Sequence, residues 1–331
     1  MSHTRVWRRL AATLLVGAAA TFLGLTIARN WSELGRYQWQ FRPARLVLSV
    51  PALALVFVWG VAVWAGVLRR FQTERVPVPR LARIWFLSSL TRYIPGKIWQ
   101  FVSAAQLARG AGLSGTVLLT SLVVYMGFNL LSAAVVAAVT LPLGTYGFGP
   151  VAVALVDGFA IASVLLVHPR VLNTLLRLMP RVLHRETLVW NGRWLDGLLL
   201  LLLSVVSWIL YGAAFTLLVT SILEVPWALL LPLAGVVALS FLAGYFVFVA
   251  PAGLGAREAV MTLLLAPYAS AGVAAVLSVV ARLWTVAGEL LGAAVVLALR
   301  AGKPDVNAAD NERPDHQGGG RPGTDHQGTA I

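Results

Sequence analysis

Residues 92–100 read RYIPGKIWQ, and this stretch interrupts an apolar run that extends from residue 81 to residue 112. A second apolar run, residues 227–268, is interrupted in the same way by PAGLG at residues 251–255. Proline removes a backbone donor and clashes with the preceding turn, and glycine adds a cost in conformational entropy. Each run is therefore predicted to consist of two helices that meet at a break. Such breaks are tolerated at membrane depth only inside protein or beside water, so we expect both to lie within a bundle.

The composition around these breaks is that of a membrane protein. Of 331 residues, 59% are hydrophobic and only 12% are charged, whereas soluble domains have about 45–50% apolar and about 25% charged residues. A single soluble globule is therefore excluded. The chain has no cysteine, which excludes disulfide frameworks, thiolate metal sites and cysteine nucleophiles.

Runs of about 20 apolar residues predict membrane-spanning helices. Four runs are uninterrupted by charge, at residues 10–28, 46–68, 115–140 and 197–223. A fifth run, residues 148–167, contains Asp157, and a sixth, residues 271–299, contains Arg282 and Glu289. The first run follows three arginines, as in a signal peptide, but it continues past the small residues that resemble a cleavage site, so we favour an uncleaved helix.

The spacing around the two breaks predicts an internal repeat. Residue 68 to Pro95 is 27 residues and residue 223 to Pro251 is 28, while each proline lies 20 residues before the next run. The predicted fold is an all-α polytopic membrane protein with about six transmembrane helices and two broken re-entrant hairpins, or eight membrane segments when the hairpins are counted. The two halves, residues 10–140 and 148–299, would form an inverted repeat. The alternative is that the similar spacing around the two breaks is a coincidence and that no repeat exists.

Basic residues predict the orientation in the cytoplasmic (inner) membrane. With both termini in the cytoplasm, the inner segments 1–9, 69–80, 168–196 and 300–331 carry 16 Lys and Arg, against 4 in the outer segments. This bias follows the positive-inside rule, and it worsens if residues 227–249 cross the membrane completely. The net charge of +13 consequently needs no nucleic-acid partner.

Two further segments are predicted outside the spans. The basic, leucine-rich stretch 168–196 is either an amphipathic helix at the membrane interface or a solvated connector with some helix. The polar, Gly-rich residues 301–331 are expected to be disordered, so residues 1–300 form the transmembrane domain.

Enzyme motifs do not occur in the sequence. There is no His-Glu-x-x-His helix, Walker loop or serine nucleophile elbow, and we predict neither catalytic residues, nor a metal site, nor a cofactor. Because no nucleotide-binding motif occurs, any transport would be passive or coupled to a gradient.

The breaks themselves suggest a different chemistry, namely anion binding. A helix that begins inside the membrane presents unpaired N–H groups and the positive end of its dipole, and such helices would begin near Lys97 and Arg257. A phosphate headgroup is the natural ligand. The alternatives are that the cations extend to the interface, or that Arg257 pairs with Glu258. The candidate lipid- or anion-binding residues are Arg92, Pro95, Gly96, Lys97, Gln100, Arg109, Pro251, Gly253, Gly255, Arg257 and Glu258.

Charged residues within the spans form a second candidate set. Asp157, Arg282 and Glu289 would each cost roughly 2.5–3.5 kcal/mol at the bilayer centre, so they should face the interior and have partners. Pairing of Asp157 with Arg282 across helices is the expected arrangement, as an ion pair or as a proton relay. Tyr125 and Asn129 lie four residues apart and either line the same cavity or pack helices together.

The segments 92–100, followed by Arg109, and 251–258 together resemble the paired motifs of the lysylphosphatidylglycerol synthase transmembrane-domain family. This is the flippase-like domain of the multiple peptide resistance factor, which also occurs as a stand-alone membrane protein. The resemblance extends in layout over about residues 10–300 and implies a lipid-handling polytopic protein. Full-length members also carry a soluble synthase domain, which has no counterpart here, so no synthase activity is expected.

The resulting hypothesis is a lipid translocase in which two opposed hairpins form a central cationic cavity for the headgroup. The substrate would be a phospholipid or a polyprenyl-phosphate lipid. Two alternatives remain. One is a non-transporting partner of a lipid synthase, another lipid-modifying enzyme or a glycosyltransferase. The other is a secondary transporter of a small solute. The oligomeric state is not predicted.

Overall fold

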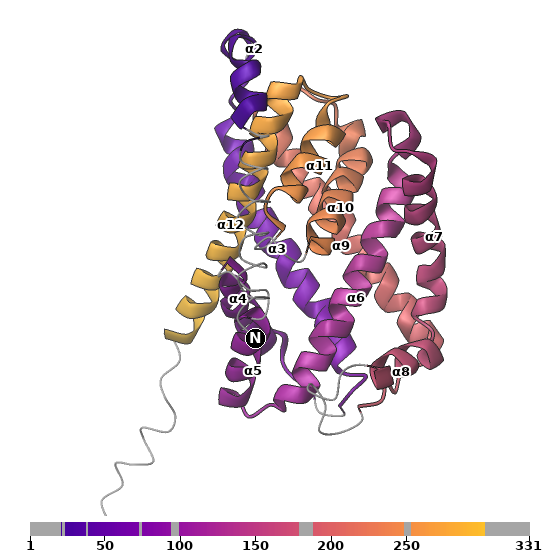
Figure 1. The fold of residues 1–331 in the computed structure, drawn as a ribbon. Helices are drawn as coiled ribbons and strands as arrows, with labels where there is room; N and C mark the ends of the chain where they lie inside the picture. The colour runs from indigo at the N-terminus through magenta and orange to yellow at the C-terminus, as the bar shows by residue number, and fades with distance from the viewer. Residues whose placement is uncertain are drawn as a thin grey trace, which may run out of the picture.

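The computed structural model describes residues 21, 24–37, 39–72, 75–93, 99–178, 188–247 and 253–301. All regular elements within these ranges are helices, which confirms the predicted all-α fold (Figure 1). The helices are α2 (Trp31–Arg36), α3 (Pro43–Leu68), α4 (Val78–Leu90), α5 (Trp99–Gly110), α6 (Gly115–Thr140), α7 (Pro150–Leu166), α8 (Pro169–Leu178), α9 (Trp194–Thr220), α10 (Leu230–Phe246), α11 (Ala256–Leu265) and α12 (Ala271–Ala301). Short 3₁₀ turns occupy η1 (Thr91–Tyr93), η2 (Leu143–Tyr146) and η3 (Trp227–Leu229).

Helix boundaries follow local sequence signals. Proline occupies the first turn of α3 and of α7, where its missing N–H would be unpaired in any case. Ser114 caps α6, because its hydroxyl accepts a hydrogen bond from the backbone N–H of Val117 at 3.4 Å. The three longest predicted spans that lie wholly in the described part, α6, α9 and α12, begin within three residues of their expected starts.

Five helical segments are long and apolar enough to cross a membrane: α3, α6, α9, Trp227–Phe246 and α12. The predicted span at residues 148–167 differs, because α7 has 17 residues and would extend only roughly 25 Å. It becomes a sixth span only together with α8, which is bent by 99° relative to α7. Most of the predicted first span, residues 10–28, and the tail beyond residue 301 lie outside the described residues.

Both interrupted runs are pairs of helices, as predicted. The first is α4 with η1, followed by α5, and the second is α10 followed by α11. With 13 and 12 residues, α4 and α5 are each too short to cross a bilayer. The first arm of the second pair is long enough to do so. Residues 94–98 and 248–252, which include Pro95, Gly96, Lys97 and Pro251, lie outside the described part of the chain.

The two broken pairs occupy equivalent places in the packing. α4 contacts α12 and α5 contacts α6, whereas α10 contacts α6 and α11 contacts α12. α3 and α9 pack against each other between them. Buried apolar side chains form two clusters, one around α10 and α11 and the other around α4 and α5. In Figure 1 the first pair lies in the lower half of the molecule and the second in the upper half.

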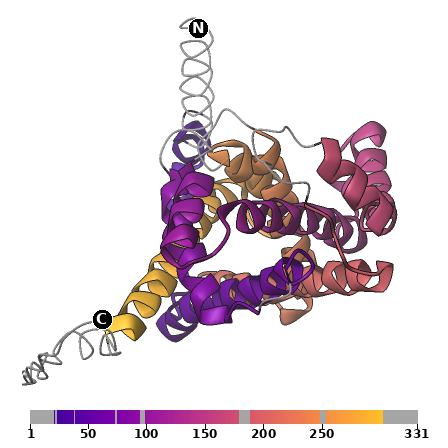
Figure 2. The same ribbon diagram turned by 90° about the horizontal axis from the view of Figure 1, so that it is seen from below.

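α7 and α8 form the side of the bundle that lies away from α12 (Figures 1 and 2). α8 is amphipathic: Leu176 is buried, whereas Arg170 and Arg177 are exposed. A helix is compatible with both interpretations of residues 168–196, and its bend from α7 suits a position in the plane of an interface. Arg181 and Arg185 lie outside the described residues.

Close packing of α9 against α10 depends on Gly212. A Cβ at this position would lie 2.7 Å from Cα of Ala234, which is backbone that cannot rotate away. We expect Gly212→Ala to lower stability by roughly 1–3 kcal/mol through overpacking. The midpoint of thermal unfolding in detergent measures the change. Gly158→Ala on α7 is the matched control, since nothing lies within 4 Å of that position, and it should leave the midpoint unchanged or raise it. Equal midpoints for both variants would contradict the packing.

Candidate functional site

A cavity of about 130 Å³ lies between the two broken pairs. Every long helix of the bundle except α7 contributes to its wall. Seven of the lining side chains are aromatic, and the rest include two arginines and one glutamate. The lining residues are Val56, Phe57, Gly60, Trp85, Arg92, Gln100, Tyr125, Met126, Asn129, Ser207, Trp208, Tyr211, Phe241, Tyr245, Arg257, Thr285 and Glu289.

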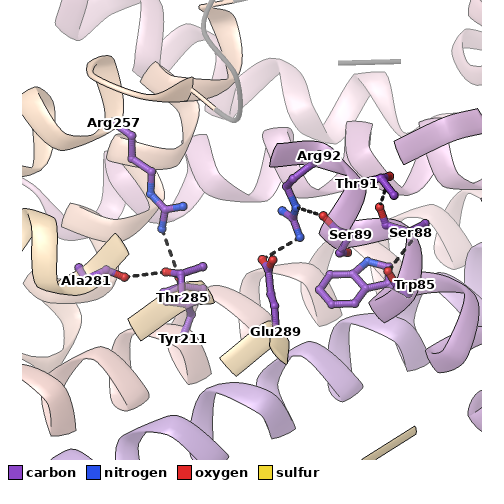
Figure 3. Close-up of polar contacts among 10 residues, drawn as sticks. All are labelled: Trp85, Ser88, Ser89, Thr91, Arg92, Tyr211, Arg257, Ala281, Thr285 and Glu289. Atoms are coloured by element: carbon purple, nitrogen blue, oxygen red, sulfur yellow. Dashed lines mark hydrogen bonds and ion pairs between the residues drawn. The ribbon is translucent and has the colours of Figure 1, made fainter. Parts of the chain in front are cut away.

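Arg92 enters the cavity from the end of α4, where the chain leaves the helix through η1. One Nη lies 2.8 Å from a carboxylate oxygen of Glu289 on α12, and Nε donates to the carbonyl oxygen of Ser89 at 3.1 Å. The guanidinium also lies over the ring of Trp85, 5.8 Å from its centroid. These contacts fix the orientation of Arg92, and Figure 3 shows its guanidinium directed toward α12. The Glu289 side chain is only 1% exposed, whereas that of Arg92 is 27% exposed.

Arg257 enters the same cavity from the first turn of α11. It donates from Nη to the hydroxyl oxygen of Tyr211 on α9 at 3.2 Å. The Tyr211 hydroxyl in turn lies 3.1 Å from the hydroxyl of Thr285 on α12. In Figure 3 both arginines extend toward α12, Arg257 toward Tyr211 and Thr285 and Arg92 toward Glu289. The structure therefore brings one cation from each broken pair into one cavity.

Glu258 holds the start of α11. One carboxylate oxygen accepts a hydrogen bond from the backbone N–H of Gly255 at 2.6 Å, and the other lies 3.8 Å from Arg282 on α12. Glu258 is 5% exposed, so the contact with Arg282 is a buried ion pair. It does not line the cavity. Its role in the described structure is to cap α11 and to fix that helix against α12.

Two glycines make the turn before α11 possible. Gly253 and Gly255 have φ angles of +70° and +94°, a region that side chains with a Cβ rarely adopt. Gly253 also packs against α10, because a Cβ there would lie 2.6 Å from Cα of Gly244. The predicted involvement of these glycines at the break is therefore structural: they bring Arg257 close to α10.

Tyr125 and Asn129 lie one turn apart on α6, and both line the cavity. This agrees with the first of the two interpretations given for them. They also contact neighbouring helices: the indole N–H of Trp208 on α9 donates to the backbone carbonyl oxygen of Asn129 at 3.2 Å. Tyr125 lies against Gly60 of α3, where a Cβ would be 2.7 Å from its hydroxyl oxygen. Both residues therefore line the cavity and contact neighbouring helices.

The remaining predicted residues divide into two groups. Gln100 lines the cavity and is 7% exposed. Arg109 is exposed in the last turn of α5, and Asp157 is exposed on α7; neither lines the cavity. The expected pair of Asp157 with Arg282 is corrected, since Arg282 contacts Glu258 and Glu289 contacts Arg92. Sequence spacing placed these charges in spans, but it did not show which face α7 turns toward its neighbours.

Sequence reasoning missed Tyr211, Thr285 and the aromatic wall. Thr285 could have been found, because Arg282, Thr285 and Glu289 recur at intervals of three and four residues and therefore share one face of α12. Tyr211 gave no such signal, since it lies in a long apolar run. The wall of rings depends on how five helices meet, which no local pattern encodes.

The described lining residues carry two positive charges and one negative charge, in a low-dielectric setting that strengthens their interactions. Within the described ranges, no three His, Asp or Glu side chains gather as a metal site would require. Arginines bind phosphate oxygens through paired donors, and the aromatic rings exclude water around them. The arrangement is therefore suited to holding an anionic group of modest size.

Comparison with characterised proteins finds no significant match over the chain. A family model described as the lysylphosphatidylglycerol synthase TM region matches residues 10–292, which include every helix that lines the cavity except the last turns of α12. The match covers the membrane region and no catalytic domain. The sequence motifs, the helical bundle with its broken pairs and this match agree, and the chain belongs to the lysylphosphatidylglycerol synthase transmembrane family.

Proposed function

We propose that the protein is a lipid translocase that binds a phosphate-bearing lipid headgroup in the cavity between its two broken helix pairs. The observation that carries the proposal is that Arg92 and Arg257, one from each pair, line one largely aromatic cavity. Membership of a transmembrane family named for a lipid synthase supports a lipid as the ligand. The substrate class is a membrane phospholipid or a polyprenyl-phosphate lipid.

The packing supports an inverted repeat as the basis of this function. Exchanging α3 with α9, α4 with α10, α5 with α11 and α6 with α12 maps each of the main contacts of one broken pair onto those of the other. The pairs also lie in opposite halves of the molecule (Figure 1). An inverted repeat would open the cavity toward either leaflet in turn by equivalent movements of its two halves. From the positive-inside bias we propose that both termini lie in the cytoplasm and that the protein lies in the cytoplasmic membrane.

The size of the cavity limits what enters it. About 130 Å³ is less than the roughly 300–1,000 Å³ of pockets that enclose drug-sized ligands. The cavity therefore receives the headgroup, while the acyl chains stay in the surrounding lipid. The same small volume favours, as a second candidate, transport of a small phosphate-bearing solute.

Transbilayer movement of labelled lipids in liposomes tests the proposal. Protein is reconstituted with phosphatidylglycerol that carries a fluorescent acyl chain, and a membrane-impermeant reductant quenches the label in the outer leaflet. We expect quenching of the inner-leaflet label only when protein is present. Gly60→Leu should reduce this movement, because the side chain would enter the cavity beside Tyr125, whereas Gly158→Leu on exposed α7 should not.

The alternatives give different results in the same liposomes. Uptake of inorganic phosphate or glycerol phosphate without lipid movement would identify a small-solute transporter. Lipid binding without movement would favour a partner that presents lipid to a synthase or a glycosyltransferase. If no labelled lipid changes its distribution and none binds, the proposed function is wrong.

A further inference from the structure

Glu289 occupies an unusual place in the cavity, because it contacts the same cation that the headgroup would use. Its carboxylate lies 2.8 Å from Nη of Arg92, and the side chain is 1% exposed. The other contacts of Arg92, to the Ser89 carbonyl and the Trp85 ring, involve its Nε and one face of the guanidinium. The Nη edge is therefore the part of Arg92 available for an anion, and Glu289 lies against it (Figure 3).

A carboxylate and a phosphate bind a guanidinium through the same donors and in similar geometry. A headgroup phosphate consequently cannot engage the Nη edge of Arg92 fully while the ionised Glu289 remains in contact with it. A proton on Glu289 removes the charge that attracts it to Arg92, so protonation and phosphate binding favour each other. By linkage, phosphate binding must equally promote proton uptake.

We propose that Glu289 is an internal competitor for the headgroup site, so that binding of a phosphodiester headgroup at Arg92 is coupled to binding of a proton at Glu289. This inference rests on the proposed function and adds to it a means of regulation. The chain has no nucleotide-binding motif, and the coupling would allow a proton gradient to bias which leaflet loads the cavity.

Under this proposal, Glu289 is the cavity group to which the proton binds. It is the only carboxylate among the described lining residues. The other titratable side chain from α11 that lines the cavity is Arg257. Those from α6, α9 and α10 are Tyr125, Tyr211 and Tyr245, respectively. The lining residues of α3 and α5 are not titratable, and Arg282 on α12 pairs with Glu258 away from the cavity. Lys97 lies outside the described residues.

Binding measurements at several pH values test the coupling. The probe is dihexanoyl phosphatidylglycerol, whose phosphodiester does not titrate between pH 5 and pH 8, and its affinity for the full chain in nanodiscs is followed by calorimetry. For the wild type we expect affinity to rise as pH falls, by at most about tenfold per pH unit for one linked proton. Glu289→Gln should bind about tenfold more tightly at pH 8 and lose the pH dependence. Glu289→Asp keeps the charge and should keep the pH dependence.

Glu224→Gln is the matched control, since Glu224 forms an exposed ion pair with Arg42 at 3.4 Å and does not line the cavity. It should bind like the wild type at every pH. Equal affinity and equal pH dependence for the wild type and for Glu289→Gln would overturn the coupling and leave the proposed function intact. Absence of binding by every chain at every pH would instead refute the proposed function, and the coupling with it. The deacylated headgroup, glycerophosphoglycerol, should show the same pH dependence with weaker binding if the lipid is the natural source of the phosphate.

Discussion

Replacing Arg92 and Arg257 together by glutamine is expected to reduce transbilayer lipid movement at least about a hundredfold. A hydrogen bond to a charged group contributes roughly 1.5–3 kcal/mol, and loss of two such groups removes about 3–6 kcal/mol of headgroup binding. Each 1.4 kcal/mol corresponds to a factor of about ten, so the single variants should lose roughly ten- to hundredfold. The liposome assay with labelled phosphatidylglycerol measures these rates.

Loss of Arg92 also leaves the buried Glu289 without that partner, which could weaken the fold rather than the site. The double variant Arg92→Gln, Glu289→Gln separates the two effects, because it removes both charges together. It should unfold at the temperature of the wild type or close to it and still move lipid slowly. Arg80→Gln, on the same helix α4 but exposed and away from the cavity, is the matched control. If Arg80→Gln and the arginine double variant lose activity equally, the cavity is not the headgroup site.

Glu258→Ala is expected to cause the largest loss of stability of any single substitution considered. Glu258 caps α11 through the Gly255 N–H and forms a buried pair with Arg282, so its loss leaves a cation buried and a helix end uncapped. Breaking a buried ion pair costs about 3–5 kcal/mol, and losing a helix cap about 1 kcal/mol. The thermal midpoint should fall by on the order of 10 °C.

A double-mutant cycle with Arg282→Gln identifies the cause. If the pair is responsible, Glu258→Gln combined with Arg282→Gln should be more stable than the sum of the single effects allows, because both charges of the pair are then removed together. Additive losses, or a midpoint for Glu258→Ala within error of the wild type, would contradict the proposed role. The partly exposed pair of Arg70 with Asp196, at 2.8 Å, serves as the comparison, and Asp196→Asn should cost about 1 kcal/mol or less.

The two chain breaks could be predicted from sequence because proline and glycine act locally. The bounds of α6 agree with the predicted residues 115–140, and each interrupted run contains two helices. α7 was predicted to be a simple span, but Pro169 begins a second helix after a bend of 99°. The change from apolar α7 to amphipathic, arginine-containing α8 is visible in the sequence, but the angle between the two helices is not, because it depends on tertiary packing.

Partners across helices could not be predicted, because they depend on tertiary packing. Asp157 was expected to pair with Arg282, yet it lies exposed on the outer helix α7, whereas Glu258, adjacent in sequence to Arg257, pairs with Arg282 instead. The position of a charged side chain within a predicted span indicates that its burial is energetically costly. The rotation of that helix about its axis decides which residues the side chain contacts. Arg92 and Arg257 line the cavity, and the sequence singled them out because each adjoins a break that is expected to lie inside the bundle.

A structure of the protein in nanodiscs of its own membrane lipids, determined by electron cryomicroscopy, tests the central claim most directly. We predict density for one lipid whose phosphate lies between the guanidinium groups of Arg92 and Arg257, with its acyl chains extending out of the cavity. In that structure the carboxylate of Glu289 should have moved away from Arg92. An empty cavity, with the Arg92 to Glu289 contact intact and lipids ordered only on the outer surface of the bundle, would contradict the account.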